Sequence, residues 1–365
     1  MNFARTLIIK PSSMGDVVQA LPVLTVLKER HPSARVSWLV GKAFAGILEG
    51  HPRLDEVIVF DRQRFGRFTV SLKVASEFAA FLADLRRRRF TTVIDLQGLL
   101  RSGVLALATG APNRVGFRQA REMAPLFYTA EVSAGRQEVH AVDRYLAVAR
   151  RLGLGRPTAR DHLPVSAESR RAIRRRLTKV GLGPEEPFVA VGAHARWPTK
   201  QWPPERFAVV LDALREATGA RAVLLGSAAA APNALAIREA MREPPIDLTN
   251  QTTLKEVAAV LAEARVMLTN DSGPMHVAAA VGTPVVALFG PTSPARTGPY
   301  GPGHHVLGGR AACSPCYRRR CRYDRTNAAM LCLTNITPDT VVDHLLEAWR
   351  DADPTPRPTD RRRRG

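Results

Sequence analysis

The segment TNDSGPMHVAAAVGTPVVALFGP, residues 269–291, carries the residue pattern with the clearest chemical meaning in this chain. Asp271 and Ser272 can cap a helix that begins near Pro274, where a proline costs no backbone hydrogen bond. The free N–H groups and the positive end of the helix dipole would favour a phosphate there. His276 lies in the same turn and could donate to a bound diphosphate. The segment therefore predicts an anion-binding helix start.

A carboxylate stands at the end of an earlier loop, PSSMGD. Asp16 could accept a proton from a hydroxyl held nearby, although a carboxylate at this position could also serve only as a helix cap. Ser12, Ser13 and Gly15 suit a tight turn with exposed N–H groups.

A third loop, ARWPTKQWP, offers positive charge. Lys200 and Arg196 could face a departing diphosphate while Trp197 and Trp202 exclude water. The alternative is a surface loop anchored by two tryptophans. An acid, a cation and an anion-binding helix start in one chain favour a functional role for these loops over a purely structural one.

The elements that must position these loops alternate between strand and helix. LIIK, VSWLV, VIVF and TVIDL read as buried strands, and residues 18–30 read as a helix. A stretch rich in Gly, Pro and Arg over residues 151–187 includes one helical segment, Glu168 to Val180. FVAVG then restarts the same alternation, so we predict an α/β fold of two open parallel sheets whose loops face a shared cleft.

We place a first domain at residues 1–165, a second at 166–350 and a disordered basic tail at 351–365, where Arg361–Arg364 follow a Pro-rich run. A chain of 365 residues with 45% hydrophobic content suits two domains. The arginine clusters at residues 86–89 and 170–176 are expected mainly on solvated helix faces.

The charge balance points to anionic partners. Lys and Arg total 53 against 33 Asp and Glu, a net charge of +20, which suits nucleotide phosphates, an acidic lipid headgroup or nucleic acid. A nucleic-acid-binding protein is one alternative, but an aromatic content of 6% and the absence of an RNA-binding signature favour no nucleic-acid partner. No apolar run approaches the ~20 residues of a membrane span, so we expect a cytoplasmic protein.

Four cysteines cluster near the C-terminus. Their spacing of CxxC followed by two further thiols could assemble a structural zinc site, although packed reduced cysteines are the alternative. The candidate ligands are Cys313, Cys316, Cys321 and Cys332.

Together these motifs resemble the bacterial lipopolysaccharide heptosyltransferases of glycosyltransferase family 9. The similarity rests on SSMGDVVQALP, DLQGLLRSG, ARWPTKQWP, NDSGPMHVAAAVGTPVVALFGPT and GPYGP. It implies a GT-B architecture, in which two Rossmann-like domains face a central cleft, and an inverting transfer of heptose from ADP-heptose. Under this resemblance Asp16 is the general base and Lys200 stabilises the leaving phosphates. The nucleotide site comprises Arg196, Asp271, Ser272, Gly273 and His276.

QAREMAPLFY and HAVDRYL are similar to the heptosyltransferase I branch, whose acceptor is an anionic, lipid-linked Kdo sugar. The resemblance implies no required cofactor or metal. We also expect a monomer, and the absence of a membrane span together with the basic surface suggests peripheral contact with the cytoplasmic face of the inner membrane. Acceptor binding is expected at Ser12, Ser13, Gly15, Arg64, Arg67, Arg101, Arg121 and Arg144. An ordinary excess of surface arginine is the alternative for the basic residues.

One departure from the family affects the donor. The loop after VLLGS reads AAAAPN, where the family often has an acidic residue that contacts the ribose. Heptosyltransferase II, another GT-B enzyme with a different nucleotide sugar, and a non-catalytic sugar-nucleotide binder therefore remain alternatives.

Overall fold

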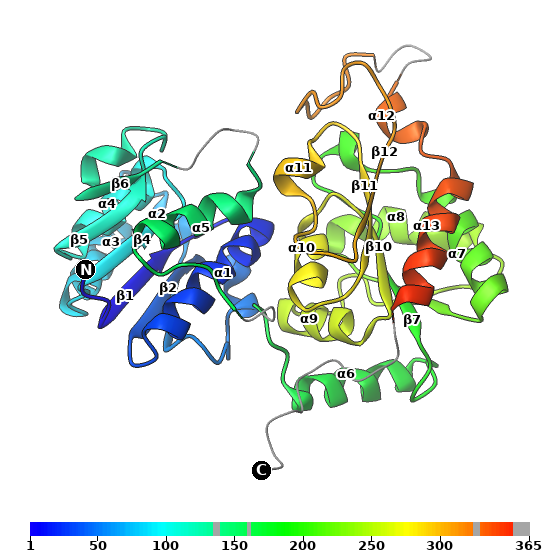
Figure 1. The fold of residues 1–365 in the computed structure, drawn as a ribbon, viewed down its shortest axis with the longest axis horizontal. Helices are drawn as coiled ribbons and strands as arrows, with labels where there is room; N and C mark the ends of the chain where they lie inside the picture. Colours follow the sequence, from blue (N-terminus) through cyan, green and yellow to red (C-terminus); the bar gives the residue numbers. More distant parts are fainter. Residues whose placement is uncertain (134–138, 159–161, 324–328, 353–365) are drawn as a thin grey trace.

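The computed structural model describes residues 1–133, 139–158, 162–323 and 329–352, which form two α/β lobes (Figure 1). The sheet of the first lobe has six parallel strands in the order β3-β2-β1-β4-β5-β6. These strands are β1 (Arg5–Ile9), β2 (Arg35–Gly41), β3 (Glu56–Phe60), β4 (Thr92–Asp95), β5 (Asn113–Phe117) and β6 (Ala130–Val132).

The second lobe repeats this arrangement with six parallel strands in the order β12-β11-β10-β7-β8-β9. In each lobe the first strand lies where the strand order reverses, which is the place where ligands bind in doubly wound sheets. The strands are β7 (Phe188–Gly192), β8 (Arg221–Leu224), β9 (Ile246–Asp247), β10 (Val266–Asn270), β11 (Val285–Phe289) and β12 (His305–Gly308).

Helices cover both sheets. The longer ones are α1 (Met14–Arg30), α3 (Leu72–Arg87), α4 (Leu100–Ala108), α5 (Ala141–Arg151), α6 (Ala167–Lys179), α7 (Pro204–Thr218), α8 (Ala231–Ala240), α9 (Leu254–Glu263), α10 (Gly273–Ala280) and α13 (Pro338–Asp351). The shorter ones are α2 (Arg62–Phe65), α11 (Pro294–Thr297) and α12 (Leu331–Thr334), with 3-10 turns η1 (Lys42–Ile47), η2 (Ala124–Phe127), η3 (Pro198–Lys200) and η4 (Ala228–Ala230). In the described part of the chain, no helix has the length and apolar character needed to cross a bilayer.

The central strands are apolar because helices cover them on both faces. Every residue of β7, β10 and β11 is buried. In the first sheet, Ile8 of β1 lies in register with Trp38 of β2 and Ile94 of β4. Burial of each such side chain contributes about 1.5–3 kcal/mol, which fixes the strand ends from which the functional loops emerge.

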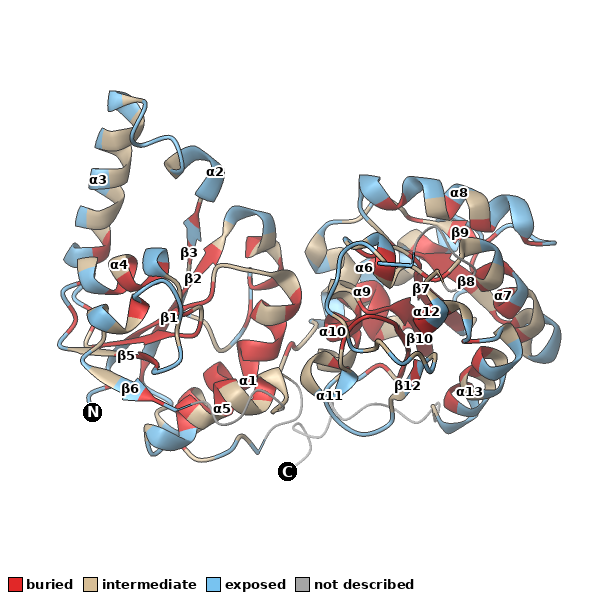
Figure 2. Cartoon of the chain, turned by 90° about the horizontal axis from the view of Figure 1, so that it is seen from above, coloured by how far each residue is buried: buried red, intermediate tan, exposed pale blue. Residues whose placement is uncertain are grey.

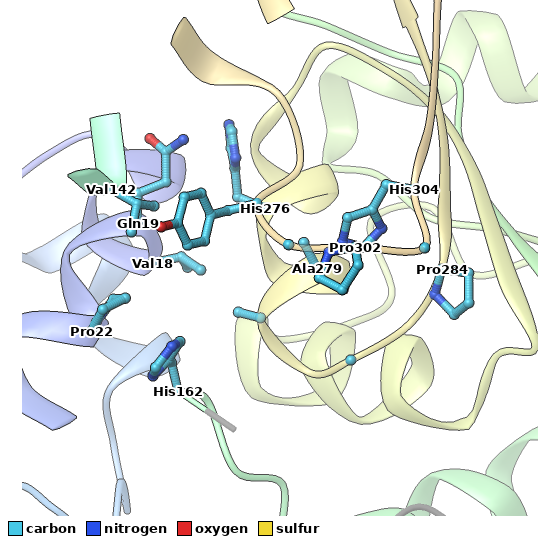
Figure 3. Close-up of a pocket in the computed structure, with 15 residues that line it drawn as sticks. Val18, Gln19, Pro22, Val142, His162, His276, Ala279, Pro284, Pro302 and His304 are labelled. Carbon is cyan, nitrogen blue, oxygen red and sulfur yellow. The ribbon is translucent and has the colours of Figure 1, made fainter. Parts of the chain in front are cut away.

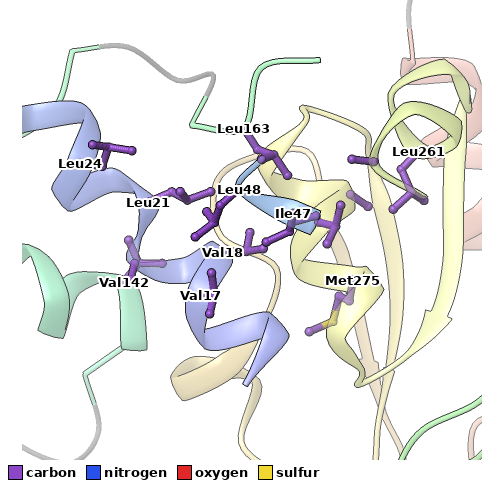
Figure 4. Packing of buried hydrophobic residues seen from close by; sticks show 14 of the residues in the cluster. Val17, Val18, Leu21, Leu24, Ile47, Leu48, Val142, Leu163, Leu261 and Met275 are labelled. Atoms are coloured by element: carbon purple, nitrogen blue, oxygen red, sulfur yellow. The ribbon is translucent and has the colours of Figure 1, made fainter. Parts of the chain in front are cut away.

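An apolar cluster also joins the two lobes. Figure 4 shows Val18 and Leu21 of α1 near Ile47 of η1, with Leu261 of α9 and Met275 of α10 in the same cluster. Figure 2 shows α1 and α10, both of which contain buried residues, beside the region between the lobes, whereas α2 and α3 stand away from it. The shared apolar contact holds the start of α1 against the start of α10.

The predicted α/β fold with two Rossmann-like lobes is confirmed, and each strand expected from the sequence is present. The first helix begins at Met14 rather than residue 18, so Asp16 belongs to its first turn and not to the preceding loop. The cause is local, because the carboxylate of Asp16 caps this turn by accepting from Ser13.

The arginines of α6 are more than a solvated face. Arg170 and Arg174 both contact Glu263, and Arg176 contacts Glu256. These ion pairs attach α6 to α9, which places α6 with the second lobe. The proposed domain boundary at residue 165 stays a prediction. Of the predicted tail, Asp351 ends α13, and residues 353–365 lie outside the described residues.

Candidate functional site

The starts of two helices, one from each lobe, meet in direct contact. A Cβ atom on Gly15 of α1 would overlap the imidazole of His276 on α10, and one on Gly273 would overlap the side chain of Met14. At Gly15 the overlap falls on a ring, so glycine is needed for this approach, whereas at Gly273 it falls on the end of the flexible Met14 side chain, which can move. The contact brings the ligand-binding end of one sheet to the corresponding end of the other.

Asp16 lies at this contact with its carboxylate oxygens in different surroundings. Oδ2 accepts from the amide of Ser13 at 3.0 Å and from its hydroxyl at 2.7 Å. Oδ1 accepts from the hydroxyl of Tyr145 at 3.2 Å and lies 3.9 Å from Nζ of Lys10. The Asp16 side chain is 40% exposed, so one face of the carboxylate remains open to a ligand.

These neighbours keep Asp16 ionised. Burial alone would raise its pKa, but the charge of Lys10 and the two hydrogen bonds from Ser13 outweigh burial and lower it. Burial lowers the pKa of Lys10, and the nearby carboxylates of Asp16 and Asp95 oppose that shift. Lys10 is only 4% exposed, so its ammonium group is shielded from solvent and interacts with the carboxylate of Asp16.

Sequence reasoning missed Lys10 and Tyr145. Lys10 ends an otherwise apolar strand segment, LIIK, and an isolated charge at that position is a usable signal because it must find a partner when buried. Tyr145 directly follows the predicted Arg144 on α5, but its hydrogen bond to Asp16 spans 129 positions of sequence. Nothing in the local pattern reveals that contact.

A cavity of about 540 Å³ opens beside Asp16 and is rich in positive charge. Arg121 and Arg144, both predicted as acceptor-binding residues, line it together with Lys10. Arg296 and Thr297 of α11 close it from the second lobe. We call this space the Asp16 cavity; it places several cations and the carboxylate of Asp16 within reach of the same ligand.

A second cavity, of about 550 Å³, lies over the first lobe. Ser12, Ser13 and Arg101 line it, and their predicted role in acceptor binding stays a prediction. Arg196 also lines it, so this arginine faces the first lobe, although the sequence placed it in the nucleotide site. The remaining cations at this cavity are Lys42 and Arg62.

Two predicted acceptor arginines lie elsewhere. Arg64 donates to both carboxylate oxygens of Glu77 on α3, at 2.7 and 2.6 Å, and this pair raises the pKa of Arg64. Arg67 is exposed, and it lines neither of these two cavities. Arg62, a neighbour of Arg64, lines the second cavity instead.

On the second lobe, Lys200 is held in place by a buried carboxylate. Its Nζ lies 2.5 Å from Oδ2 of Asp271, which also accepts from the hydroxyl of Thr292 at 2.5 Å. Nζ also lies 4.8 Å from the centre of the Trp197 ring. Asp271 thus orients Lys200 and does not cap α10, which corrects the expected role of this aspartate.

The start of α10 is left available for an anion. Ser272 is the N-cap residue, as predicted, but its side chain makes no capping hydrogen bond. Pro274 occupies the first turn without losing a donor. The amides of this turn and the helix dipole therefore remain free to bind a phosphate beside Lys200.

His276 lies between the two charged groups. It is buried, and burial lowers its pKa to about 4 although Asp271 and Asp16 both favour the charged form. The ring is therefore neutral at pH 7. It also lines an interlobe cavity of about 430 Å³, where Figure 3 shows it with Gln19, Val142 and His304.

The cysteine segment covers the Lys200 loop. The carbonyl of Arg318 accepts from the hydroxyl of Thr199 at 2.8 Å, and the guanidinium of Arg319 lies over the ring of Trp197 at 5.3 Å. Burial, followed by the other three thiols, raises the pKa of Cys332 to about 11. Among the described residues these four cysteines do not form a group placed to hold a metal ion, and the zinc site expected at Cys313, Cys316, Cys321 and Cys332 stays a prediction.

Two doubly wound lobes that bring a carboxylate and the start of a helix to one gap form a GT-B architecture. Comparison with known proteins identifies the family. Residues 78–327 match the model of glycosyltransferase family 9 (heptosyltransferase). The chain belongs to this family.

Individual relatives agree with this assignment. Lipopolysaccharide heptosyltransferase 1 of Pseudomonas aeruginosa is 30% identical over 93% of this chain and 97% of the relative. The protein of the same name from Salmonella typhimurium is 32% identical over 85% of this chain and 94% of the relative. The solved structure of E. coli heptosyltransferase WaaC with ADP superimposes with a TM-score of 0.74 at 27% identity, covering 94% of this chain and 99% of that one.

The neutral state of His276 has a measurable consequence. Its pKa is about 4 in the folded protein and 6.5 in an ordinary setting, so the unfolded chain binds the extra proton first as the pH falls. The lowered pKa therefore makes the free energy of unfolding depend on pH. This free energy has its full value above pH 6.5 and falls by about 3 kcal/mol between about pH 6.5 and 4. We expect His276→Gln to lose less thermal stability than the wild type between pH 7.5 and 4.5. Equal losses in both proteins would contradict the buried neutral ring.

Proposed function

We propose that this protein transfers heptose from ADP-heptose to the Kdo sugar of the lipid A inner core, as a heptosyltransferase I. The observation that carries the proposal is the open carboxylate of Asp16 in a cationic cavity that both lobes line. Relatives named lipopolysaccharide heptosyltransferase 1 and the ADP complex of WaaC support this choice of acceptor and donor.

The Asp16 cavity suits an anionic acceptor sugar. Arg121 and Arg144 would bind the Kdo carboxylate, and the adjoining cavity with Arg101 and Arg62 would bind phosphate groups of the lipid. Guanidinium groups suit this task because they stay charged and can contact both oxygens of a carboxylate.

Asp16 would act as the general base. Its lowered pKa keeps it ionised, and it takes the acceptor proton as the hydroxyl oxygen attacks the anomeric carbon from the face opposite ADP. The sugar–phosphate bond breaks in the same displacement, which inverts the anomeric centre. Tyr145 and Lys10 position the carboxylate through Oδ1, and Ser13 does so through Oδ2.

The leaving ADP would be stabilised from the second lobe. Lys200 and the free amides at the start of α10 would bind its diphosphate, with Asp271 as the residue that positions Lys200. His276, neutral at pH 7, can donate a hydrogen bond without adding charge. These groups supply the charge stabilisation for which some glycosyltransferases use a metal.

Two alternatives compete with this assignment of donor and acceptor. The loop over η4 carries alanines where an acidic ribose contact is often found in the family, so the alternatives are a GT-B enzyme with another nucleotide sugar and heptosyltransferase II. Asn233, at the start of α8, donates to the carbonyl of Ala193 and to Gln201, so it is already engaged within the protein.

We further propose that the protein works in the cytoplasm at the inner face of the membrane, where a lipid-linked acceptor is embedded. The segment between α2 and α3 supports this location, because Phe68, Val70 and Leu72 are 47%, 81% and 92% exposed. Arg67 and Lys73 flank them on the same segment. Exposed apolar side chains beside cations are suited to an anionic lipid surface.

A transfer assay tests the function directly. Purified protein is given ADP-heptose with either Kdo-bearing lipid A or the same lipid already carrying one heptose, and transfer is measured by mass spectrometry. We expect transfer to the first acceptor and little to the second. Preferred transfer to the heptosylated lipid would indicate a heptosyltransferase II, and transfer only from UDP or GDP sugars would overturn the donor assignment.

Two variants in this assay separate the roles of the lobes. Asp16→Ala removes the proton acceptor and should abolish transfer while ADP binding, measured by calorimetry, stays close to wild type. Lys200→Ala should slow the chemical step because charge on the leaving phosphate is no longer offset. If Asp16→Ala loses affinity for ADP but keeps its turnover, Asp16 is not the general base. If Lys200→Ala transfers heptose at the wild-type rate, Lys200 does not stabilise the leaving group.

Membrane contact is tested with vesicles that contain anionic phospholipid. Replacing both Val70 and Leu72 by serine should weaken binding about tenfold or more, because burial of each side chain contributes about 1.5 kcal/mol or more. Val209→Ser is the matched control, since Val209 of α7 is 54% exposed on the second lobe. Equal vesicle binding by wild type and double variant would exclude this segment as the contact.

A further inference from the structure

Two histidines and a glutamate converge at the edge of the second sheet. His305 begins β12, the edge strand, and His344 and Glu347 lie on α13, which packs against β11 and β12 (Figure 1). Residues three apart on a helix share a face, so both α13 side chains can reach the same partner on the strand. This cluster has no part in the transfer mechanism described above.

The ligand atoms of these residues lie at the separations found around a bound metal. Nδ1 of His305 lies 3.0 Å from Nδ1 of His344. Oε2 of Glu347 lies 3.6 Å from the first nitrogen and 3.5 Å from the second. Within the described residues this is the one group of three or more potential ligands whose atoms all lie within 4.8 Å of one another.

We propose that His305, His344 and Glu347 bind one divalent transition-metal ion, of which zinc is the best match. The point equidistant from the three ligand atoms lies about 2.0 Å from each, which is the usual length of zinc bonds to histidine nitrogen and carboxylate oxygen. Two imidazoles and one carboxylate also form a donor set that zinc favours, and three protein ligands leave positions open for water.

The surroundings allow an ion to enter and to remain. The side chains of His305, His344 and Glu347 are 19%, 39% and 54% exposed. The site is therefore partly buried at the histidines and accessible to solvent at the carboxylate. Without a metal, one imidazole must carry a proton on Nδ1 to donate to the other. Binding moves that proton to Nε2 or to water and lets both Nδ1 lone pairs face the ion.

The ion would connect α13 to the strand that leads into the interlobe cavity. His304, the residue before His305, lines that cavity, as does His276 (Figure 3). Because consecutive strand residues point to opposite sides, one residue can face the cavity while the next faces α13. The site is therefore structural, and the chemistry at Asp16 does not depend on its ligands.

The experiment must distinguish this site from the four cysteines, since thiolates also bind zinc. Untagged full-length protein is stripped with chelator and titrated with Co²⁺, a spectroscopic substitute for zinc, in the wild type and in a variant with Cys313, Cys316, Cys321 and Cys332 replaced by serine. We expect one equivalent of Co²⁺ in the cysteine-free variant, with no thiolate charge-transfer absorption. If that variant fails to fold, the same equivalent is identified in the wild type by a Co²⁺ spectrum that lacks this absorption.

Ligand variants test the assignment. His344→Ala and Glu347→Gln should each weaken binding about tenfold or more, as expected for loss of one of three ligands, and should remove the rise in thermal midpoint that added zinc produces. Asp343→Asn is the matched control, because Asp343 is an exposed carboxylate of the same helix outside the ligand group. Binding unchanged by either ligand variant, binding only through thiolates, or no binding of the ion would overturn the proposal.

Discussion

The contact between the first turns of α1 and α10 is the constraint on which the site depends. Helix α1 follows β1, and helix α10 follows β10, so each helix starts beside the switch point of its own sheet. Doubly wound lobes bind ligands at this point. Gly15 and Gly273 let the two starts touch, and the apolar cluster around Leu21 and Met275 holds them there. A proton acceptor and an anion-binding site, encoded more than 250 residues apart, are thereby brought to one gap.

Charge then divides the gap into two functional sides. On the first lobe, Lys10 and Tyr145 fix a carboxylate that stays ionised. On the second lobe the polarity is reversed, because the buried carboxylate of Asp271 fixes the ammonium of Lys200. His276 separates the two pairs as a neutral ring, so opposite charges face each other across the cleft without forming a direct ion pair. This arrangement suits two substrates, an anionic acceptor bound on the first lobe and a donor whose diphosphate leaving group is bound on the second.

Much of this architecture follows from local sequence patterns. FVAVG, VMLTN and VVALF predict their strands because helices cover both faces of a parallel sheet, and the anion-binding helix start is readable from DSGP. The partner of a charged side chain is harder to predict from local sequence patterns. Arg64 was expected at the acceptor site but pairs with Glu77, and Asp271 was expected as a cap but pairs with Lys200. These pairings depend on tertiary distances, which no local spacing encodes, and the same is true of the metal-ligand group formed by β12 and α13.

If the close approach of α1 and α10 sets the catalytic geometry, an alanine at Gly15 should disturb that geometry. The new methyl group must displace the ring of His276, so the account predicts that Gly15→Ala lowers kcat about 100-fold while the protein stays folded and binds ADP. Gly46→Ala is the control, because its Cβ would meet Leu254 of the other lobe at an ordinary 3.8 Å, and it should retain wild-type kcat. A Gly15→Ala enzyme that turns over at the wild-type rate would contradict the account.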